Sequence, residues 1–220
     1  MYGITAFHMT DFVNSRREFA GWNFDQAKRK RFLNALLWII EECVEYRMAC
    51  SVYIDDYRYL DRSYCVRETM RPYTMGCLTC ASAVTIWAEQ NGRRKQDLIW
   101  VFEKGDEDQN DLRKRWDVAH RGGLIDEPIF CKKVDYYPDK TVCRRIRAFE
   151  AADLIAYEHL SVHRQLEEKQ GADFYEDELS PVMLRMKKWP DAQDWKVCDM
   201  ASLETLCAHW QVPERPRSSV

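Results

Sequence analysis

Residues 147–158 read Arg-Ala-Phe-Glu-Ala-Ala-Asp-Leu-Ile-Ala-Tyr-Glu, and this stretch decides the fold that we expect. Its apolar side chains recur at helical spacing, and neither Gly nor Pro occurs between positions 144 and 170. The apolar positions are 148, 149, 151, 152, 155, 156 and 160. The pattern predicts a long, half-buried helix over residues 144–168 that packs through these positions.

Asp153 is the unusual residue of this helix, because it is a short carboxylate at the edge of the face that should pack. A buried charge needs a hydrogen bond, an ion pair or a bound cation. Asp153 is therefore either a boundary residue, solvated or paired with Arg145 or Arg147, or part of a metal site that a second carboxylate completes. The basic group Arg144, Arg145 and Arg147 could steady the carboxylate or hold a phosphate.

A second carboxylate is expected at the end of the clearest strand. Residues 97–103 form a continuous apolar run that ends in Glu103, which predicts a central strand covered on both faces. Functional groups of open α/β sheets lie at the carboxyl ends of strands, so Glu103 is well situated. Residues 106–111 are interpreted as a solvated acidic loop and a helix start.

The rest of the chain alternates helical and strand patterns, as an α/β fold requires. Asp25 is a plausible N-cap for the second helix. We expect helices over residues 25–47, 74–90, 111–119, 181–186 and 200–210, strands over 48–54 and 129–134, and an irregular tail elsewhere after 171, with 213–220 frayed.

The N-terminal residues contain a candidate pair, His8 and Asp11, whose spacing would suit a metal site on a helix. Thr10 and the alternation of aromatic residues argue against a helix there, so we favour a loop in which His8 packs and Asp11 caps. Residues 13–23 are then predicted to be an exposed basic and aromatic loop.

Three further motifs have a chemical and a structural interpretation each. The basic run at residues 28–31 could contact phosphates or be a solvated face. Asp55 and Asp56 end a predicted strand, where adjacent side chains point to opposite faces. Cys77 and Cys80 form a C-x-x-C, but no second pair completes a zinc site, so we favour core packing.

Composition limits the location and the partners. The net charge of -3 and the pI near 6.0 create no overall attraction to nucleic acid or anionic membranes, so any such binding needs a local patch. Nine cysteines form no disulfide framework, and the first thirty residues lack an apolar signal core, which indicates the reducing cytoplasm. The longest apolar run, residues 35–40, is too short to span a bilayer, so we expect a soluble protein without a membrane partner.

Three motifs in this order carry a resemblance to a known family. They are Phe-His-Met-Thr-Asp-Phe at residues 7–12, Val-Phe-Glu-Lys-Gly-Asp at 101–106, and the helical stretch at 149–158. Together they resemble the prokaryotic family called domain of unknown function 3800, whose fold is ribonuclease H-like. The resemblance covers most of the chain up to about residue 165.

The resemblance implies a ribonuclease H-like domain over residues 1–170, a mixed sheet flanked by helices, with residues 171–220 as a helical and irregular extension packed on it. It also implies a metal-dependent nuclease-like activity on nucleic-acid phosphodiesters. Glu103 and Asp153 would be the catalytic ligands of Mg²⁺ or Mn²⁺, and Glu150 an outer ligand.

The same resemblance gives the remaining candidate residues their roles. His8 and Asp11 would line the channel for the nucleic acid, and Arg144, Arg145 and Arg147 would touch its phosphates.

The chain departs from this family at its start. Family members usually begin with a strand that ends in Asp-Glu-Ser-Gly and supplies the central metal ligand, and nothing here matches it, so we expect the first strand to be missing. A catalytically inactive nucleic-acid- or protein-binding module is therefore the alternative, and a zinc or redox protein built on Cys77 and Cys80 a third. The exposed sheet edge could pair with a second copy of the chain.

Overall fold

The computed structural model describes residues 4, 7–105, 108–123, 125–132, 134–136, 142–145, 147–168, 180–187, 193–198, 200–209 and 212–215. The chain forms two compact units, each made of two separate stretches. Unit 1 consists of Met1–Arg47 and Lys132–Ala192, and unit 2 of Met48–Cys131 and Gln193–Val220. The described residues are mostly helical with short strands, which is α/β in the broad sense. The predicted division at residue 170 falls outside the described residues and stays a prediction.

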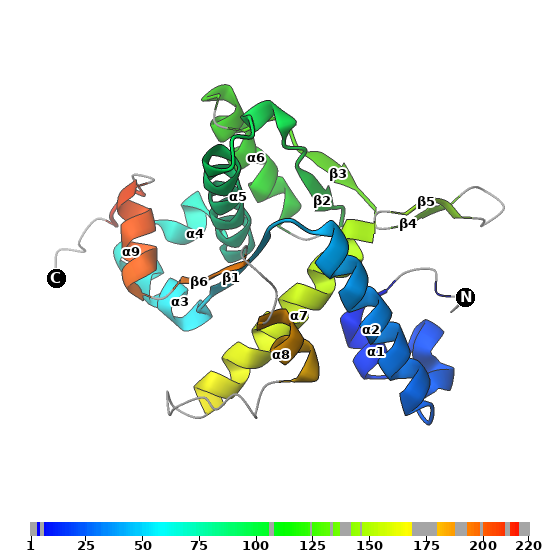
Figure 1. Ribbon diagram of the computed structural model, residues 1–220. Coiled ribbons are helices and arrows are strands. Elements are labelled where there is room, and N and C mark those ends of the chain that lie inside the picture. The colour runs from blue at the N-terminus through cyan, green and yellow to red at the C-terminus, as the bar shows by residue number, and fades with distance from the viewer. Residues whose placement is uncertain are drawn as a thin grey trace. The chain divides into compact units, whose positions relative to one another are not determined.

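Unit 1 is built around the long helix that the sequence predicts (Figure 1). The antiparallel strands β4 and β5 lead into α7, and α1 packs against both η1 and α7. The elements of this unit are α1 (Met9–Val13), η1 (Arg17–Trp22), α2 (Gln26–Cys43), β4 (Val134–Tyr136), β5 (Val142–Arg145), α7 (Arg147–Glu168) and α8 (Pro181–Lys187).

The core of unit 1 begins with five aromatic rings from its N-terminal segments. Neighbouring ring centroids lie between 5.2 and 6.0 Å apart, and several pairs meet edge to face. The rings belong to Phe7, Phe12, Phe19, Trp22 and Phe32. The prediction of an exposed loop over residues 13–23 is wrong for 17–22, which form a 3-10 helix in which Phe19 and Trp22 are buried. Arg16 and Arg17 are exposed, as expected.

The start of α2 is tied to this aromatic cluster. Arg29 donates to the Phe12 carbonyl and to Ser15 Oγ, at 2.8 Å each, and the Lys28 ammonium lies 4.1 Å from the centre of the Trp22 ring. Two residues of the basic run at 28–31, for which the sequence left phosphate contact and a solvated face open, thus make contacts within the fold. Lys30 and Arg31 are the exposed members of the run.

Asp25 caps α2, as the sequence predicts, by accepting a hydrogen bond from the Lys28 amide at 2.8 Å. We expect Asp25→Ala to lower the free energy of unfolding by about 1 kcal/mol, because this N–H loses its acceptor. Asp25→Asn keeps an acceptor oxygen and should change it by a few tenths. Urea denaturation of the three proteins measures the difference, and an equal loss in both variants would contradict the capping role.

Unit 2 contains a parallel β-α-β motif, in which α6 connects β2 to its neighbour β3 (Figure 1). Strands β1 and β6 form a second pair. The elements are β1 (Arg47–Val52), α3 (Ile54–Ser63), α4 (Val66–Thr69), α5 (Pro72–Gln90), η2 (Lys95–Asp97), β2 (Val101–Glu103), α6 (Gln109–Arg121), β3 (Ile129–Cys131), β6 (Gln193–Cys198) and α9 (Met200–His209).

The predicted central strand over residues 97–103 is largely wrong. The Asp97 carboxylate accepts from the backbone N–H and the guanidinium of Arg94, and the Asp97 amide donates to the Arg94 carbonyl at 2.9 Å. These bonds hold residues 95–97 in a 3-10 turn. Ile99 is 76% exposed, so the run is not covered on both faces. Only Val101–Glu103 is a strand, and among the described residues it pairs with β3 alone.

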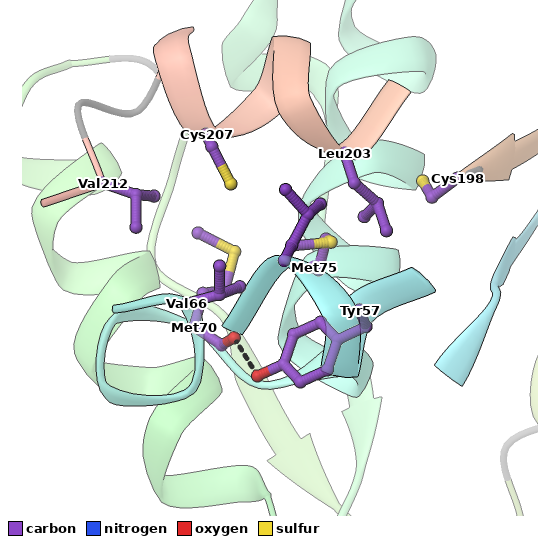
Figure 2. Close-up of a cluster of buried hydrophobic side chains, with 9 residues drawn as sticks. Tyr57, Val66, Met70, Met75, Cys198, Leu203, Cys207 and Val212 are labelled. Carbon is purple, nitrogen blue, oxygen red and sulfur yellow. Dashed lines mark hydrogen bonds between the residues drawn. The ribbon is translucent and has the colours of Figure 1, made fainter. Parts of the chain in front are cut away.

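Two hydrophobic clusters form the core of unit 2, and α5 contributes to both. One cluster gathers α3, α4, α5 and α9, and Figure 2 shows Leu203 and Cys207 pointing toward Met70 and Met75. The other surrounds Trp116, with Trp100 and Phe102 packed on it. The helix predicted over residues 74–90 is confirmed, and it extends from Pro72.

The C-terminal stretch belongs to unit 2 and is more regular than the sequence indicates. Residues 193–198 form β6, which the sequence analysis missed. Arg215 then contacts α3 and α4. Its amide donates to the Ser63 carbonyl, and its guanidinium contacts Asp61 and Glu68. The prediction that the chain frays from 213 is wrong for residues 213–215, and 216–220 lie outside the described residues.

Candidate functional site

Asp153 joins α7 to the start of α1. Its Oδ2 atom accepts a hydrogen bond from the Met9 amide at 2.9 Å and lies 3.7 Å from His8 Nδ1. His8 is the N-cap residue of α1, but its own side chain makes no capping bond there. The carboxylate from α7 therefore satisfies an N–H of the first turn of α1, where negative charge is favourable.

The N-terminal helix corrects one expectation. The sequence analysis favours a loop around His8 and Asp11, yet helix α1 begins at Met9, with Asp11 in its first turn. The helix is only five residues long, and it includes Thr10, whose side chain is exposed. The Oδ2 atom of Asp11 lies 3.5 Å from Arg17 Nε. His8 thus lies beside Asp153, whereas the described ion pair of Asp11 is with Arg17.

The buried face of α7 is not the one that the apolar pattern predicts. Positions 148, 152, 156 and 160, all apolar, are exposed and form one stripe with a spacing of four. Among the described residues of α7, six side chains are buried, and four of them are polar. The six are Glu150, Leu154, Ile155, Glu158, His159 and His163. Periodicity predicts that a helix forms but not which of its faces is covered. Because alanine buries little apolar area, the prediction of burial is wrong for positions 148, 152, 156 and 160.

Glu150 lies one helical turn before Asp153, and its side chain is 6% exposed. Asp153, in contrast, has a side chain that is 37% exposed. The pair therefore combines a buried carboxylate with one that solvent reaches.

Glu103 ends β2, as predicted, and its side chain is exposed. It belongs to unit 2, whereas Asp153 belongs to unit 1. The meeting of these two carboxylates stays a prediction.

The basic group Arg144, Arg145 and Arg147 is described through its backbone alone. In the β4–β5 hairpin, Arg144 is the register partner of Asp135, and Arg145 that of Val134. Arg147 is the first residue of α7. The side chains of the three arginines lie outside the described residues, so their predicted contact with phosphate stays a prediction.

A metal site requires potential ligands that lie close together. Within the described ranges, no three or more His, Cys, Asp or Glu side chains gather as a metal-binding group. Mg²⁺ in proteins is often held by one or two carboxylates together with waters and substrate phosphates. An oriented, partly exposed carboxylate such as Asp153 fits that smaller requirement.

The C-x-x-C motif packs in the core of unit 2. Cys77 lies against the Trp116 cluster, and burial raises the pKa of the Cys80 thiol to about 11. A thiol with a raised pKa is a poor nucleophile and a poor metal ligand at neutral pH. These observations favour the interpretation of both cysteines as packing residues.

A second polar group on α7 was missed by the sequence analysis. Ser180 donates to Glu158 Oε2 at 2.6 Å and accepts from the Met183 amide at 3.0 Å, which caps α8. Burial raises the pKa of Glu158. His159 follows Glu158 along α7, and the ring centroids of His159 and His163 lie 4.4 Å apart. The spacing of four between the two histidines was the available signal.

These histidines predict an acid-sensitive fold. Burial first, and then the neighbouring His163, lower the pKa of His159 from 6.5 to about 4. As the pH falls, the unfolded chain therefore takes up a proton at His159 before the folded chain does. The contribution of His159 to the free energy of unfolding is fully present above the unfolded pKa and is lost as the pH drops toward 4. We expect the free energy of unfolding to lose about 2 kcal/mol through His159 between about pH 7 and about pH 5.

Urea denaturation at both pH values, with His159→Gln, measures this contribution. The variant should lose less stability on acidification than the parent, whereas His120→Gln, which alters an exposed histidine of α6, should behave as the parent does. Glu158, whose pKa is raised, acts in the opposite direction in both proteins and cancels in the comparison. An unchanged pH dependence in His159→Gln would exclude His159 as the cause.

No helix in the part of the chain that the structure describes is both long and apolar enough to cross a membrane. Comparison of the chain with protein-family models, with curated proteins and with solved structures finds no match.

Proposed function

We propose that this chain is a nuclease-like protein of the ribonuclease H-like class that hydrolyses nucleic-acid phosphodiesters with Mg²⁺ or Mn²⁺. The observation that supports this best is the setting of Asp153. One of its oxygens is fixed by the Met9 amide, His8 lies beside it, and 37% of the side chain is exposed. A carboxylate that is already oriented and still open to solvent is suited to binding a metal and a substrate.

The metal would be held by few protein ligands. Asp153 and Glu103 would supply the two carboxylates, with Glu150 as an outer ligand, and water and the substrate phosphate would fill the remaining positions. A bound Mg²⁺ or Mn²⁺ activates water and stabilises the leaving oxygen of a phosphodiester. The position of Glu103 supports its choice as a ligand, because this residue lies at the carboxyl end of β2, a strand of the parallel pair.

The protein's own groups would orient the reactants and move the proton. The hydrogen bond from the Met9 amide to Oδ2 holds the Asp153 carboxylate in one orientation. The His8 imidazole, 3.7 Å from that carboxylate, is a group that can accept a proton from the attacking water, and solvent would protonate the leaving oxygen on the opposite side of the phosphorus. Arg144, Arg145 and Arg147, near the start of α7, would bind the phosphates of the strand.

An inactive nucleic-acid-binding module is the second candidate, and the exposed basic residues Lys30 and Arg31 at the start of α2 favour it. Such a module would bind phosphate backbones through charge alone. Its affinity would fall steeply with salt and would be indifferent both to divalent metal and to Glu103→Gln.

The experiment that separates these candidates is a cleavage assay on labelled single-stranded and duplex RNA and DNA. We expect cleavage of at least one substrate in Mg²⁺ or Mn²⁺ and none in the presence of a chelator. Binding without cleavage, equal with and without metal, would reject hydrolysis and support the binding module.

A further inference from the structure

A pocket in unit 2 takes no part in the proposed hydrolysis. It has a volume of about 540 Å³, within the range of roughly 300–1,000 Å³ that is usual for small-molecule sites. Three arginines, two tyrosines and one carboxylate dominate its lining: Arg58, Arg67, Arg71, Tyr57, Tyr73 and Asp108. All of these residues belong to unit 2, so the pocket is formed within a single unit.

The three arginines reach the pocket from different elements. Arg58 comes from α3, Arg67 from α4, and Arg71 is the N-cap residue of α5. Their side chains are 63%, 66% and 56% exposed, in that order. Convergence of three cations on one concave surface is unfavourable unless anions compensate it. The acidic neighbours of the three arginines therefore decide how strongly the pocket attracts an anionic ligand.

Each of these arginines already has an acidic neighbour. Arg58 pairs with Asp55 at 3.1 Å, Arg67 approaches Asp61 at 3.6 Å, and Arg71 pairs with Asp108 at 2.8 Å. Exposed ion pairs of this kind contribute little to stability, so the guanidinium groups can turn toward a ligand at small cost. Among the three acidic partners, only Asp108 lines the pocket. The lining thus carries three positive charges against one negative charge.

The start of α5 adds to this positive potential. The helix is 19 residues long and begins at Pro72, and the side chain of its N-cap residue, Arg71, makes no capping bond. The Arg71 amide donates to Asp111 Oδ2 at 3.0 Å, so a carboxylate that does not line the pocket satisfies one N–H at this end. Arg71, Pro72 and Tyr73 all line the pocket, so the N-terminal end of the helix dipole faces it. Three arginines beside a helix N-terminus match the charge and the hydrogen-bonding needs of a phosphate group.

The remaining wall is aromatic and apolar. Tyr57 donates its hydroxyl to the Met70 carbonyl at 2.9 Å, as Figure 2 shows, which fixes its ring in place. Tyr57 itself is only 4% exposed, so the accessible part of this wall comes from Tyr73, at 36% exposure, and Ile54, at 44%. Such a surface accommodates the flat face of a base.

We propose that this pocket binds a nucleoside monophosphate group, with the phosphate held by Arg58, Arg67 and Arg71 and the base against Tyr73 and Ile54. The group would be either a free mononucleotide or the phosphorylated end of a nucleic-acid strand. The inference does not rest on the proposed hydrolysis, because it concerns other residues and requires no metal.

Calorimetric titration of the full chain with AMP, without divalent metal, tests the pocket. We expect Arg58→Gln and Arg67→Gln each to weaken AMP binding about tenfold, since each removes a charge-assisted hydrogen bond. Arg94→Gln is the matched control, because Arg94 is an exposed arginine with an i,i+3 aspartate partner, like Arg58, and lies outside the pocket. Adenosine should bind more weakly than AMP, and inorganic phosphate should compete with AMP.

Two oligonucleotides that differ only in a terminal phosphate or hydroxyl identify the source of the group. A preference for the phosphorylated strand that AMP abolishes points to strand ends, and AMP binding without such a preference points to the free nucleotide. The proposal is overturned if neither AMP nor the phosphorylated strand binds at millimolar concentration. It is equally overturned if Arg94→Gln weakens binding as much as the pocket variants do.

Discussion

Asp153→Asn is expected to reduce metal-dependent cleavage about a hundredfold or more while leaving the protein folded. The Asn side chain keeps an oxygen that can accept the hydrogen bond from the Met9 amide, so the link between α7 and α1 persists. It lacks the negative charge that a hard divalent cation requires of its ligand. The measurement is kcat/KM for the best nucleic-acid substrate in Mn²⁺, with circular dichroism to verify the fold.

Asp97→Asn is the control for this variant. Asp97 is also a partly exposed aspartate, at 42%, with a described hydrogen bond to a backbone amide, but it belongs to η2 in unit 2. This substitution should leave kcat/KM unchanged within a factor of about 2. Wild-type activity in a folded Asp153→Asn variant would remove Asp153 from the proposed catalytic residues.

Trp116→Ala should cause the largest loss of stability, about 3–5 kcal/mol in the free energy of unfolding. The Trp116 side chain is 0% exposed, and the rings of Trp100 and Phe102 pack on it at centroid distances of 5.3 and 4.9 Å. Its indole N–H also donates to the Asp126 carbonyl at 2.8 Å. Truncation therefore opens a cavity between α5, α6 and the β2–β3 pair and leaves a carbonyl without its donor.

Trp38→Ala provides the comparison, because Trp38 lies on α2 and is 57% exposed. We expect it to change the free energy of unfolding by less than about 1 kcal/mol. Chemical denaturation of both variants measures the two losses. Similar losses would contradict the packing that is described around Trp116.

Sequence patterns predicted α2, α5, α6, α7, α8 and α9 because their signals are local, but they missed α1 and α3. The acceptor at Asp25, the uninterrupted run before Gly171 and the small apolar residues of α5 each act within a few turns of chain. Structure that depends on distant partners was predicted poorly. β6 pairs with β1, which lies far away along the chain, and the first residue of the strand expected over 97–103 is instead held in a 3-10 turn by the hydrogen bonds between Arg94 and Asp97.

The candidate site shows the same limit. Helical periodicity identified Asp153 as unusual, but the Met9 amide and His8 as its neighbours could not be predicted, because 144 residues separate the hydrogen-bonded pair along the chain. The arginine pocket of unit 2 was also missed, since its residues are spread over α3, α4 and the start of α5. In each case the chemistry depends on residues that only folding brings together.

Titration of the intact protein with Mn²⁺ tests the central proposal most directly. We expect saturable binding in the parent and in Asp97→Asn, and at least about tenfold weaker binding in both Asp153→Asn and Glu103→Gln, because the two carboxylates are proposed to hold one ion. Binding of Mn²⁺ by Asp153→Asn with the affinity of the parent would contradict the assignment of Asp153 as a metal ligand, and with it the nuclease proposal.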